Sequence, residues 1–191
     1  MNQIFSRLGI ALALSSIFTG CQTTYERRDP TGETFPSVLG TALDDRVVTI
    51  PDDFSGQETL LFVGYKMESQ FDIDRWLLAL NESGVSVSIY ELPTIPGLIP
   101  GLFARVIDDG MRSGIPEDDW AIVVTIYDDA KVVARFLGNA TPLPARVVLL
   151  DGDGRVAFFH DRGFSIETLL RLKEALKQVR SEPLASTPKV R

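Results

Sequence analysis

Apolar residues recur with two different periods along the middle of the chain, and these periods predict its strands and helices. Leu60–Tyr65 is an unbroken apolar run, which is expected of a strand that is buried on both faces. Ser69 is followed three residues later by the acidic Asp72, a pattern typical of a helix start. Ile73, Trp76 and Leu80 then recur at helical spacing. The same reasoning predicts further strands at 46–50, 85–90, 121–127, 147–150 and 156–159, helices at 101–111 and 166–179, and either a hairpin partner or a short helix at 132–136.

The order of these elements predicts an α/β domain with a mixed sheet flanked by helices, which ends in a β-hairpin and a helix. The last two predicted strands are separated by Asp151-Gly152-Asp153-Gly154. This tetrapeptide lacks the third acidic position and the closing Glu of a calcium loop, so we interpret it as a hairpin turn. The domain is expected to span 35–180, and the polar residues 181–191 are expected to form a disordered tail.

Two stretches of this domain carry a resemblance to a known family. The first runs from Phe35-Pro36 through Val48-Thr49-Ile50-Pro51 to Gly56 and Leu60–Val63. The second is Arg146–Val156, an apolar strand that leads into an Asp-x-x-Gly turn. Together they resemble the peroxiredoxin-like domains of the thioredoxin-like fold over most of 35–179. The resemblance implies this fold, and it implies a functional site in the loop after the first long strand.

The chain departs from that family where the family's chemistry resides. Redox members carry a Cys at the start of the helix after the first long strand, where free N–H groups and the helix dipole stabilise a thiolate. Lys66–Gln70 stands at this place and contains no Cys. Pro144 resembles the cis-proline of thioredoxins, and Arg146 resembles the active-site Arg of peroxiredoxins. Each lies one residue away from its position in the family pattern, and this shift would turn the Arg146 side chain to the other face of the strand. A looser resemblance, to the cysteine-free mitochondrial ATP synthase assembly factor family, implies that such a domain can serve assembly.

The first residues have the pattern of a bacterial secretory signal. Met1–Gly20 carries one charge, Arg7, and an apolar run at Ile10–Phe18 that is too short to span a bilayer. Phe18-Thr19-Gly20-Cys21 resembles the lipobox of bacterial lipoproteins, which implies that the signal peptide 1–20 is removed and that Cys21 is acylated. The alternative is an ordinary cleavable signal followed by a chance Cys.

Acylation would decide where the protein resides. Several acyl chains on Cys21 would make a permanent anchor, and Gln22 after the Cys implies the outer membrane, with the domain facing the periplasm. Residues 21–34 are polar and have no apolar period, so they are expected to form a flexible tether that holds the domain off the lipid.

Charge and composition exclude several classes of function. The sequence has 19 basic and 26 acidic residues, and loss of Arg7 with the signal leaves 18 − 26 = −8. This balance argues against nucleic acid as a partner and against tight contact of the domain with anionic lipid. Cys21 is the only Cys, so the acylated chain has no thiol for peroxidase or disulfide chemistry. His160 is the only His and no phosphate-binding or dinucleotide motif is present, so neither a metal nor a cofactor is expected.

Two segments are candidate binding sites. Lys66, Met67, Ser69 and Gln70 are expected to meet the loop that contains Pro144 at the carboxyl end of the sheet, where open α/β sheets bind ligands. Met67 would suit a peptide and Lys66 an anion, whereas the structural alternative is that Ser69 caps a helix, Lys66 is solvated and Met67 fills a gap.

Arg112 is the second candidate. Gly110 and Gly114 flank it, and its guanidinium suits a carboxylate or phosphate. A basic last turn of a helix that is stopped by glycine explains the same residues.

These expectations define one preferred function and two alternatives. The preferred function is that of a lipid-anchored, non-redox thioredoxin-like domain that binds an envelope protein or peptide. A deep pocket that gathers Glu91, Arg112 and Asp161 would instead favour an enzyme acting on a small substrate. The third possibility is capture of a small anion at the helix start formed by 66–69.

Overall fold

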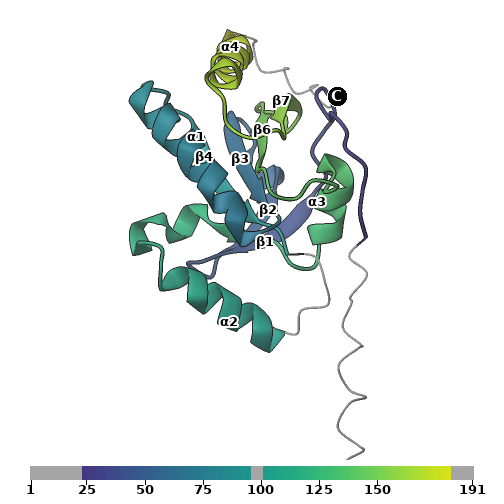
Figure 1. Ribbon diagram of the computed structural model, residues 1–191, viewed down its shortest axis with the longest axis vertical. Coiled ribbons are helices and arrows are strands. Elements are labelled where there is room, and N and C mark those ends of the chain that lie inside the picture. Colours follow the sequence, from purple (N-terminus) through teal and green to yellow (C-terminus); the bar gives the residue numbers. More distant parts are fainter. Residues whose placement is uncertain (1–22, 96–100, 182–191) are drawn as a thin grey trace, which may run out of the picture.

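A four-stranded mixed sheet forms the centre of the domain in the computed structural model, which describes residues 23–95 and 101–181 (Figure 1). The strands lie in the order β4 (Ser88–Pro93), β3 (Thr59–Gly64), β6 (Arg146–Leu150) and β7 (Val156–His160). β3 pairs in parallel with β4 and antiparallel with β6, and β6 and β7 form an antiparallel hairpin. The predicted turn closes this hairpin, because the Asp151 carboxylate accepts the N–H groups of Asp153 and Arg155.

A smaller antiparallel sheet contains β2 (Val47–Ile50), β1 (Val38–Ala42) and β5 (Val124–Thr125). The pattern did not predict β1, because Gly40 interrupts it. The structure needs this glycine: a Cβ at position 40 would lie 2.5 Å from a methyl carbon of Val124 on β5. The predicted strand at 121–127 is shorter in the structure, because residues 121 and 122 belong to the 3₁₀ helix η3 (Glu117–Ile122). The two residues of β5 pair with β1, and Val123 and Ile126 on either side of them form isolated parallel bridges to Glu91 and Thr94 at the β4 edge of the central sheet.

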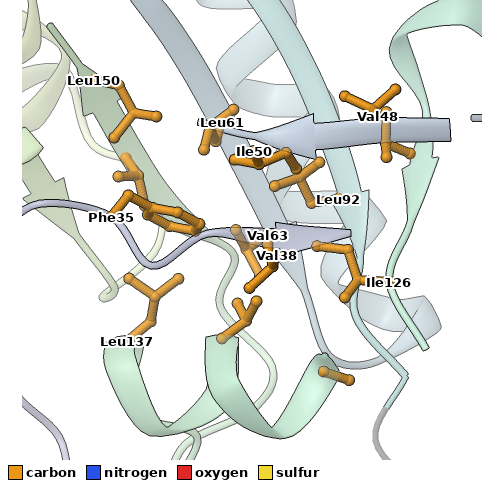
Figure 2. Packing of buried hydrophobic residues seen from close by; sticks show 14 of the residues in the cluster. Phe35, Val38, Val48, Ile50, Leu61, Val63, Leu92, Ile126, Leu137 and Leu150 are labelled. Atoms are coloured by element: carbon orange, nitrogen blue, oxygen red, sulfur yellow. The ribbon is translucent and has the colours of Figure 1, made fainter. Parts of the chain in front are cut away.

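Helices cover both faces of the central sheet. α1 (Gln70–Glu82) and α4 (Ile166–Ser181) pack on one face, and α3 (Ala130–Leu137) packs on the other together with β1 and β2. The apolar run of β3 is unbroken because both faces of this strand are buried. Leu61 and Val63 enter the α3 side of the core, while Leu60 and Phe62 enter the α1 side. Figure 2 shows the α3 side, where Leu61 and Val63 face Phe35, Val38 and Leu137. The expected α/β architecture is confirmed.

Two of the predicted elements have different bounds in the structure. Residues 132–136 belong to the helix α3, and β4 begins three residues later than predicted and continues to Pro93. α2 (Gly101–Arg112) agrees with the predicted helix at 101–111. Among the described residues, none of the helices is long and apolar enough to cross a membrane.

The two predicted helix caps differ in outcome. The Ser165 hydroxyl accepts the N–H of Thr168 and begins α4, as its position predicts. Ser69 does not cap α1: the 3₁₀ turn η2 (Met67–Ser69) precedes this helix, and the Ser69 hydroxyl donates to the carbonyl of Pro142, 3.3 Å away.

Residues 23–34, which we call the neck, lie against the domain. The Tyr25 N–H donates to the Asn139 side chain at 2.7 Å, and the Arg27 guanidinium forms two hydrogen bonds with the carboxylate of Asp161. Further along, the Gly32 N–H donates to the Val156 carbonyl at 2.8 Å. The expected flexible tether is therefore wrong for these residues, because their bonds go to groups more than 100 positions away, which a search for local periodicity does not detect. The predicted signal peptide, Cys21 and residues 182–191 lie outside the described residues.

Candidate functional site

The candidate site lies at the carboxyl end of β3, where the chain passes through Tyr65, Lys66 and η2 into α1. Besides the bond from Ser69 to Pro142, the buried Asp72 in the first turn of α1 ties this segment to two others. Its carboxylate accepts the N–H of Ala145 at 3.1 Å and that of Phe164 at 2.7 Å. The helix start and the loop 142–144 are thus brought together, as the sequence predicted.

Apolar side chains project from these two joined segments. Met67 is 90% exposed, Phe71 is 71% exposed one turn later, and Leu143 is 55% exposed beside Pro142. We call these three residues the Met67 surface. Met67 does not fill a gap in the core, which removes the structural alternative for that residue. The segments that carry the three residues are joined by the bond from Ser69 to Pro142, and exposed apolar patches are typical of surfaces that bind partners.

The polar candidates of this segment have different surroundings. Lys66 is exposed, and within residues 23–95 and 101–181 it takes part in no ion pair. The Gln70 amide donates to Asp74 at 3.0 Å and to Glu91 at 3.2 Å. Burial raises the pKa of Glu91, and the hydrogen bond from Gln70 opposes that rise.

Arg146 is 1% exposed and serves as an internal donor to the loop that precedes it. Its guanidinium donates to the carbonyls of Thr141 at 2.8 Å, Pro144 at 2.7 Å and Gly138 at 3.2 Å. It also lies over the ring of Tyr65, 4.9 Å from the centroid. Burial lowers the pKa of Arg146 and raises that of Tyr65, whose hydroxyl is buried without a hydrogen-bond partner in the described structure. Arg146 is therefore a buried structural residue that holds the 138–144 loop in place at the candidate site.

The peptide bond before Pro144 is trans. Within the described residues the cis bond is that between Ile50 and Pro51. Pro144 contributes to the site through its carbonyl, which accepts from Arg146.

The structure does not gather the residues that would have favoured an enzyme. Arg112 donates to the Leu43 carbonyl, Asp45 and Asp109, while Asp161 is bound by Arg27 and Glu91 by Gln70. Arg112 ends α2, in agreement with the interpretation as a basic last turn. A shallow depression lies elsewhere, and it is lined by Gln57, Glu58, Ser86, Val87, Ser88 and Arg180.

His160 and the acidic residues make structural contacts. The His160 ring bonds to the carbonyl of Gly163 at 2.8 Å and packs edge-on against Trp76. Among the described residues, no three His, Cys, Asp or Glu side chains lie close enough together to hold a metal ion.

Sequence reasoning missed Phe71 and Asp72 as parts of the site, and it included Leu143 only as part of the loop that contains Pro144. Phe71 lies outside the apolar stripe of its helix, which is the signal that could have marked it as exposed. The sequence marks Asp72 only as the acidic residue that follows Ser69 by three positions at a predicted helix start. Its role depends on N–H groups 73 and 92 residues away.

Comparison with known proteins identifies the fold. No protein-family model and no curated protein matches the sequence. Yeast Sco1 with copper bound is 12% identical, with 83% of this chain and 98% of that chain covered and a TM-score of 0.55. A SCO1/SenC family lipoprotein from Bacillus anthracis is 10% identical (80% and 98% covered, TM-score 0.52), and a thiol peroxidase from Chromobacterium violaceum is 12% identical (81% and 92% covered, TM-score 0.51). The chain is thus a thioredoxin-like domain, and at these identities the likeness shows the fold alone.

Proposed function

We propose that this protein is a lipid-anchored envelope protein whose thioredoxin-like domain binds another envelope protein or a peptide without thiol chemistry. The observation that carries the proposal is the Met67 surface, which places exposed apolar groups where the redox members of the resembling family keep a Cys. The outer membrane, with the domain facing the periplasm, is the location that Gln22 favours. The looser resemblance to an assembly factor family supports an accessory or assembly role.

Desolvation of the Met67 surface supplies the driving force for binding. Full burial of a Met, Leu or Phe side chain contributes about 1.5–3 kcal/mol, so three such residues can support a specific contact. Met67 is the most exposed of the three and has a flexible, polarizable side chain that adapts to an apolar partner. The Met67 surface therefore suits an extended or helical apolar segment of the partner.

The charges around the site support a protein or peptide over a small anion. Glu68 and Asp72 flank the start of α1, and Asp72 already accepts two backbone N–H groups there. The Ser69 hydroxyl already donates to the carbonyl of Pro142, so it is not free to donate to an anion. Lys66 is then the one basic side chain of the 66–70 segment that could bind an anion. Carboxylates at a helix start compete with an external anion for the same partial positive charge.

Anchoring rests on the signal pattern that ends at Cys21. With several acyl chains, attachment would be effectively permanent. Loss of labelled-palmitate incorporation in a Cys21→Ala variant is the expected result, and continued labelling of this variant would refute the anchor.

Partner binding is tested by affinity purification of the lipidated protein from native envelopes in mild detergent, followed by mass spectrometry. A stoichiometric envelope protein should be captured by the wild type and lost with Met67→Glu. Leu170→Glu is the matched control, because Leu170 is a 60% exposed residue of α4, on another element. The captured protein is then purified and titrated against each variant. Equal binding by wild type and Met67→Glu would show that the proposed surface is wrong.

A further inference from the structure

The neck leaves very little free chain between the domain and the proposed lipid attachment at Cys21. A free tether of 14 residues, 21–34, would reach about 50 Å when fully extended. Because the Asn139 side chain donates a hydrogen bond to the carbonyl of Thr23, the chain between this fixed point and Cys21 is two residues long, about 7 Å when extended. A domain of this size has a radius of gyration of roughly 15 Å, so such a short link prevents it from turning freely about the anchor.

Hydrogen bonds to Asn139 fix the beginning of the neck. The Asn139 side chain donates to the carbonyl of Thr23 at 3.2 Å and accepts the N–H of Tyr25 at 2.7 Å. The Tyr25 carbonyl in turn accepts the N–H groups of Asn139 and Ala140, both at 3.1 Å. The lipid attachment must therefore lie within about 7 Å of a point held by the loop that follows α3.

The neighbouring surface belongs to the outer side of α3. Figure 1 shows the purple neck passing beside α3, and the guanidinium of Arg135 lies 5.6 Å from the ring centroid of Tyr25. Lys131 and Val132 precede Arg135 by four and three residues, so the three side chains share one face of the helix, and all are exposed. Neither Lys131 nor Arg135 forms an ion pair within residues 23–95 and 101–181.

Two of the three side chains on this face are basic, in a chain with 26 acidic and 19 basic residues. These basic groups are available to lipid phosphates, and Val132, which is 42% exposed, provides an apolar contact between them. Two acidic residues, Asp128 and Asp129, lie at the beginning of α3, and the Asp129 carboxylate accepts the N–H of Leu39.

We propose that the neck clamps the domain onto the bilayer that carries its acyl anchor, with Lys131, Val132 and Arg135 of α3 against the lipid headgroups. The inference rests on the proposed acylation of Cys21 and adds the orientation of the domain to it. The partner of this surface is a phospholipid bilayer. The α1 and α4 side of the sheet then faces away from the lipid.

The acylated chain offers a direct test, because Cys21 would have no free thiol and a single engineered Cys can be labelled with an environment-sensitive fluorophore. Val132→Cys reports on the α3 face, and Leu78→Cys, 62% exposed on α1, is the control on the opposite face of the sheet. Each full-length lipidated protein is reconstituted on vesicles of phosphatidylcholine with phosphatidylglycerol. Lipids with spin-labelled headgroups then quench labels that lie at the membrane surface.

Strong quenching at position 132 and weak quenching at position 78 is the expected result. Asn139→Ala removes the side-chain bonds to Thr23 and Tyr25, so it should loosen the beginning of the neck and reduce the difference between the two labels, while the melting temperature reports that the domain remains folded. Lys131→Gln should lower the ratio of docked to detached domains about fivefold on these anionic vesicles, as expected for one basic residue at such a surface. Lys177→Gln, on exposed α4, should leave the ratio unchanged.

The outcomes separate this inference from the proposed anchor. Protein that floats with the vesicles but shows equal quenching at positions 132 and 78 would overturn the clamped orientation and leave the anchor intact. Stronger quenching of a Phe71→Cys label than of the Val132→Cys label would also overturn it, because the Met67 surface would then be the side that meets lipid. Protein that fails to float would refute the anchor and this orientation with it.

Discussion

Gly138 gives the sharpest test of the docked neck, because the neck crosses directly over it. The residue ends α3 with φ 73° and ψ 148°, a conformation that is essentially restricted to glycine. A Cβ added there would lie 2.6 Å from the Glu26 carbonyl oxygen and 3.1 Å from the Arg27 Cα. Both contacts are with backbone atoms of the neck, which cannot rotate away as the end of a flexible side chain can.

Two costs add in a Gly138→Ala variant. The backbone strain contributes about 1–3 kcal/mol. The steric conflict with the neck contributes about 1–3 kcal/mol more, as overpacking usually does. A total loss of about 2–6 kcal/mol should lower the melting temperature by roughly 4–24 °C for a domain of this length.

The assay is thermal and urea unfolding of the mature, unlipidated Cys21→Ala protein with and without Gly138→Ala. Gly56→Ala is the matched control, since Gly56 has φ 86° but no atom within 4 Å of an added Cβ, so it should show the backbone strain alone. In a chain that lacks residues 21–29, the penalty at Gly138 should shrink to that of the control. A Gly138→Ala variant that is no less stable than Gly56→Ala would refute the docked neck.

Three further predictions concern single side chains. Arg27→Ala should lower the free energy of unfolding by about 2 kcal/mol, because it leaves the largely buried carboxylate of Asp161 without its partner. Arg28→Ala, which removes an exposed ion pair, should lower it by under about 1 kcal/mol in the same urea titration. Equal losses in the two variants would contradict this prediction. Asp72→Ala should cost about 2–4 kcal/mol, since two backbone N–H groups lose their acceptor, and unchanged urea unfolding would show that the three segments do not depend on it. Because burial raises the pKa of Glu91, the folded state binds its proton more tightly than the unfolded state, and stability is lost as pH rises from the ordinary value of about 4.3 through the raised pKa. Glu91→Gln should therefore raise the melting temperature relative to the wild type at neutral pH but not below the ordinary Glu pKa, and an equal difference at both would refute the assignment.

The sequence predicted correctly those strands and helices whose signal lies within a few neighbouring residues. The run at Leu60–Tyr65 identified the central strand, because a strand with two buried faces has no polar positions. The spacing of Ile73, Trp76 and Leu80 identified the buried face of α1, and all three side chains are less than 5% exposed. Ser165 identified the start of α4, because its cap bond reaches only three residues ahead.

Elements that depend on distant partners were not predictable in the same way. Gly40 reads as an interruption of a strand until the position of Val124 is known, at which point it becomes the residue that permits the pairing. The neck has no apolar period because backbone hydrogen bonds, an amide and an ion pair dock it, with Tyr25 alone packing on the core. The sequence predicted that the helix start and the 142–144 loop meet at the carboxyl end of β3, and they do, but the exposure of Phe71 and the buried position of Arg146 required the tertiary structure.

The polar groups at the end of β3, where redox members of the family that the chain resembles carry a thiol, form bonds within the domain, and this constrains what the site can do. Arg146 spends its hydrogen bonds on three carbonyls of the 138–144 loop, and Asp72 accepts two N–H groups from the segments on either side of the β6–β7 hairpin. Side chains already satisfied by backbone groups have little capacity left for proton transfer or anion capture. Apart from Lys66 and the buried hydroxyl of Tyr65, the side chains of the site left without partners are apolar and exposed. The free energy available from these apolar groups is desolvation, which favours association with another apolar surface. If the neck also fixes the domain at the membrane, that association is confined to partners within reach of the same bilayer.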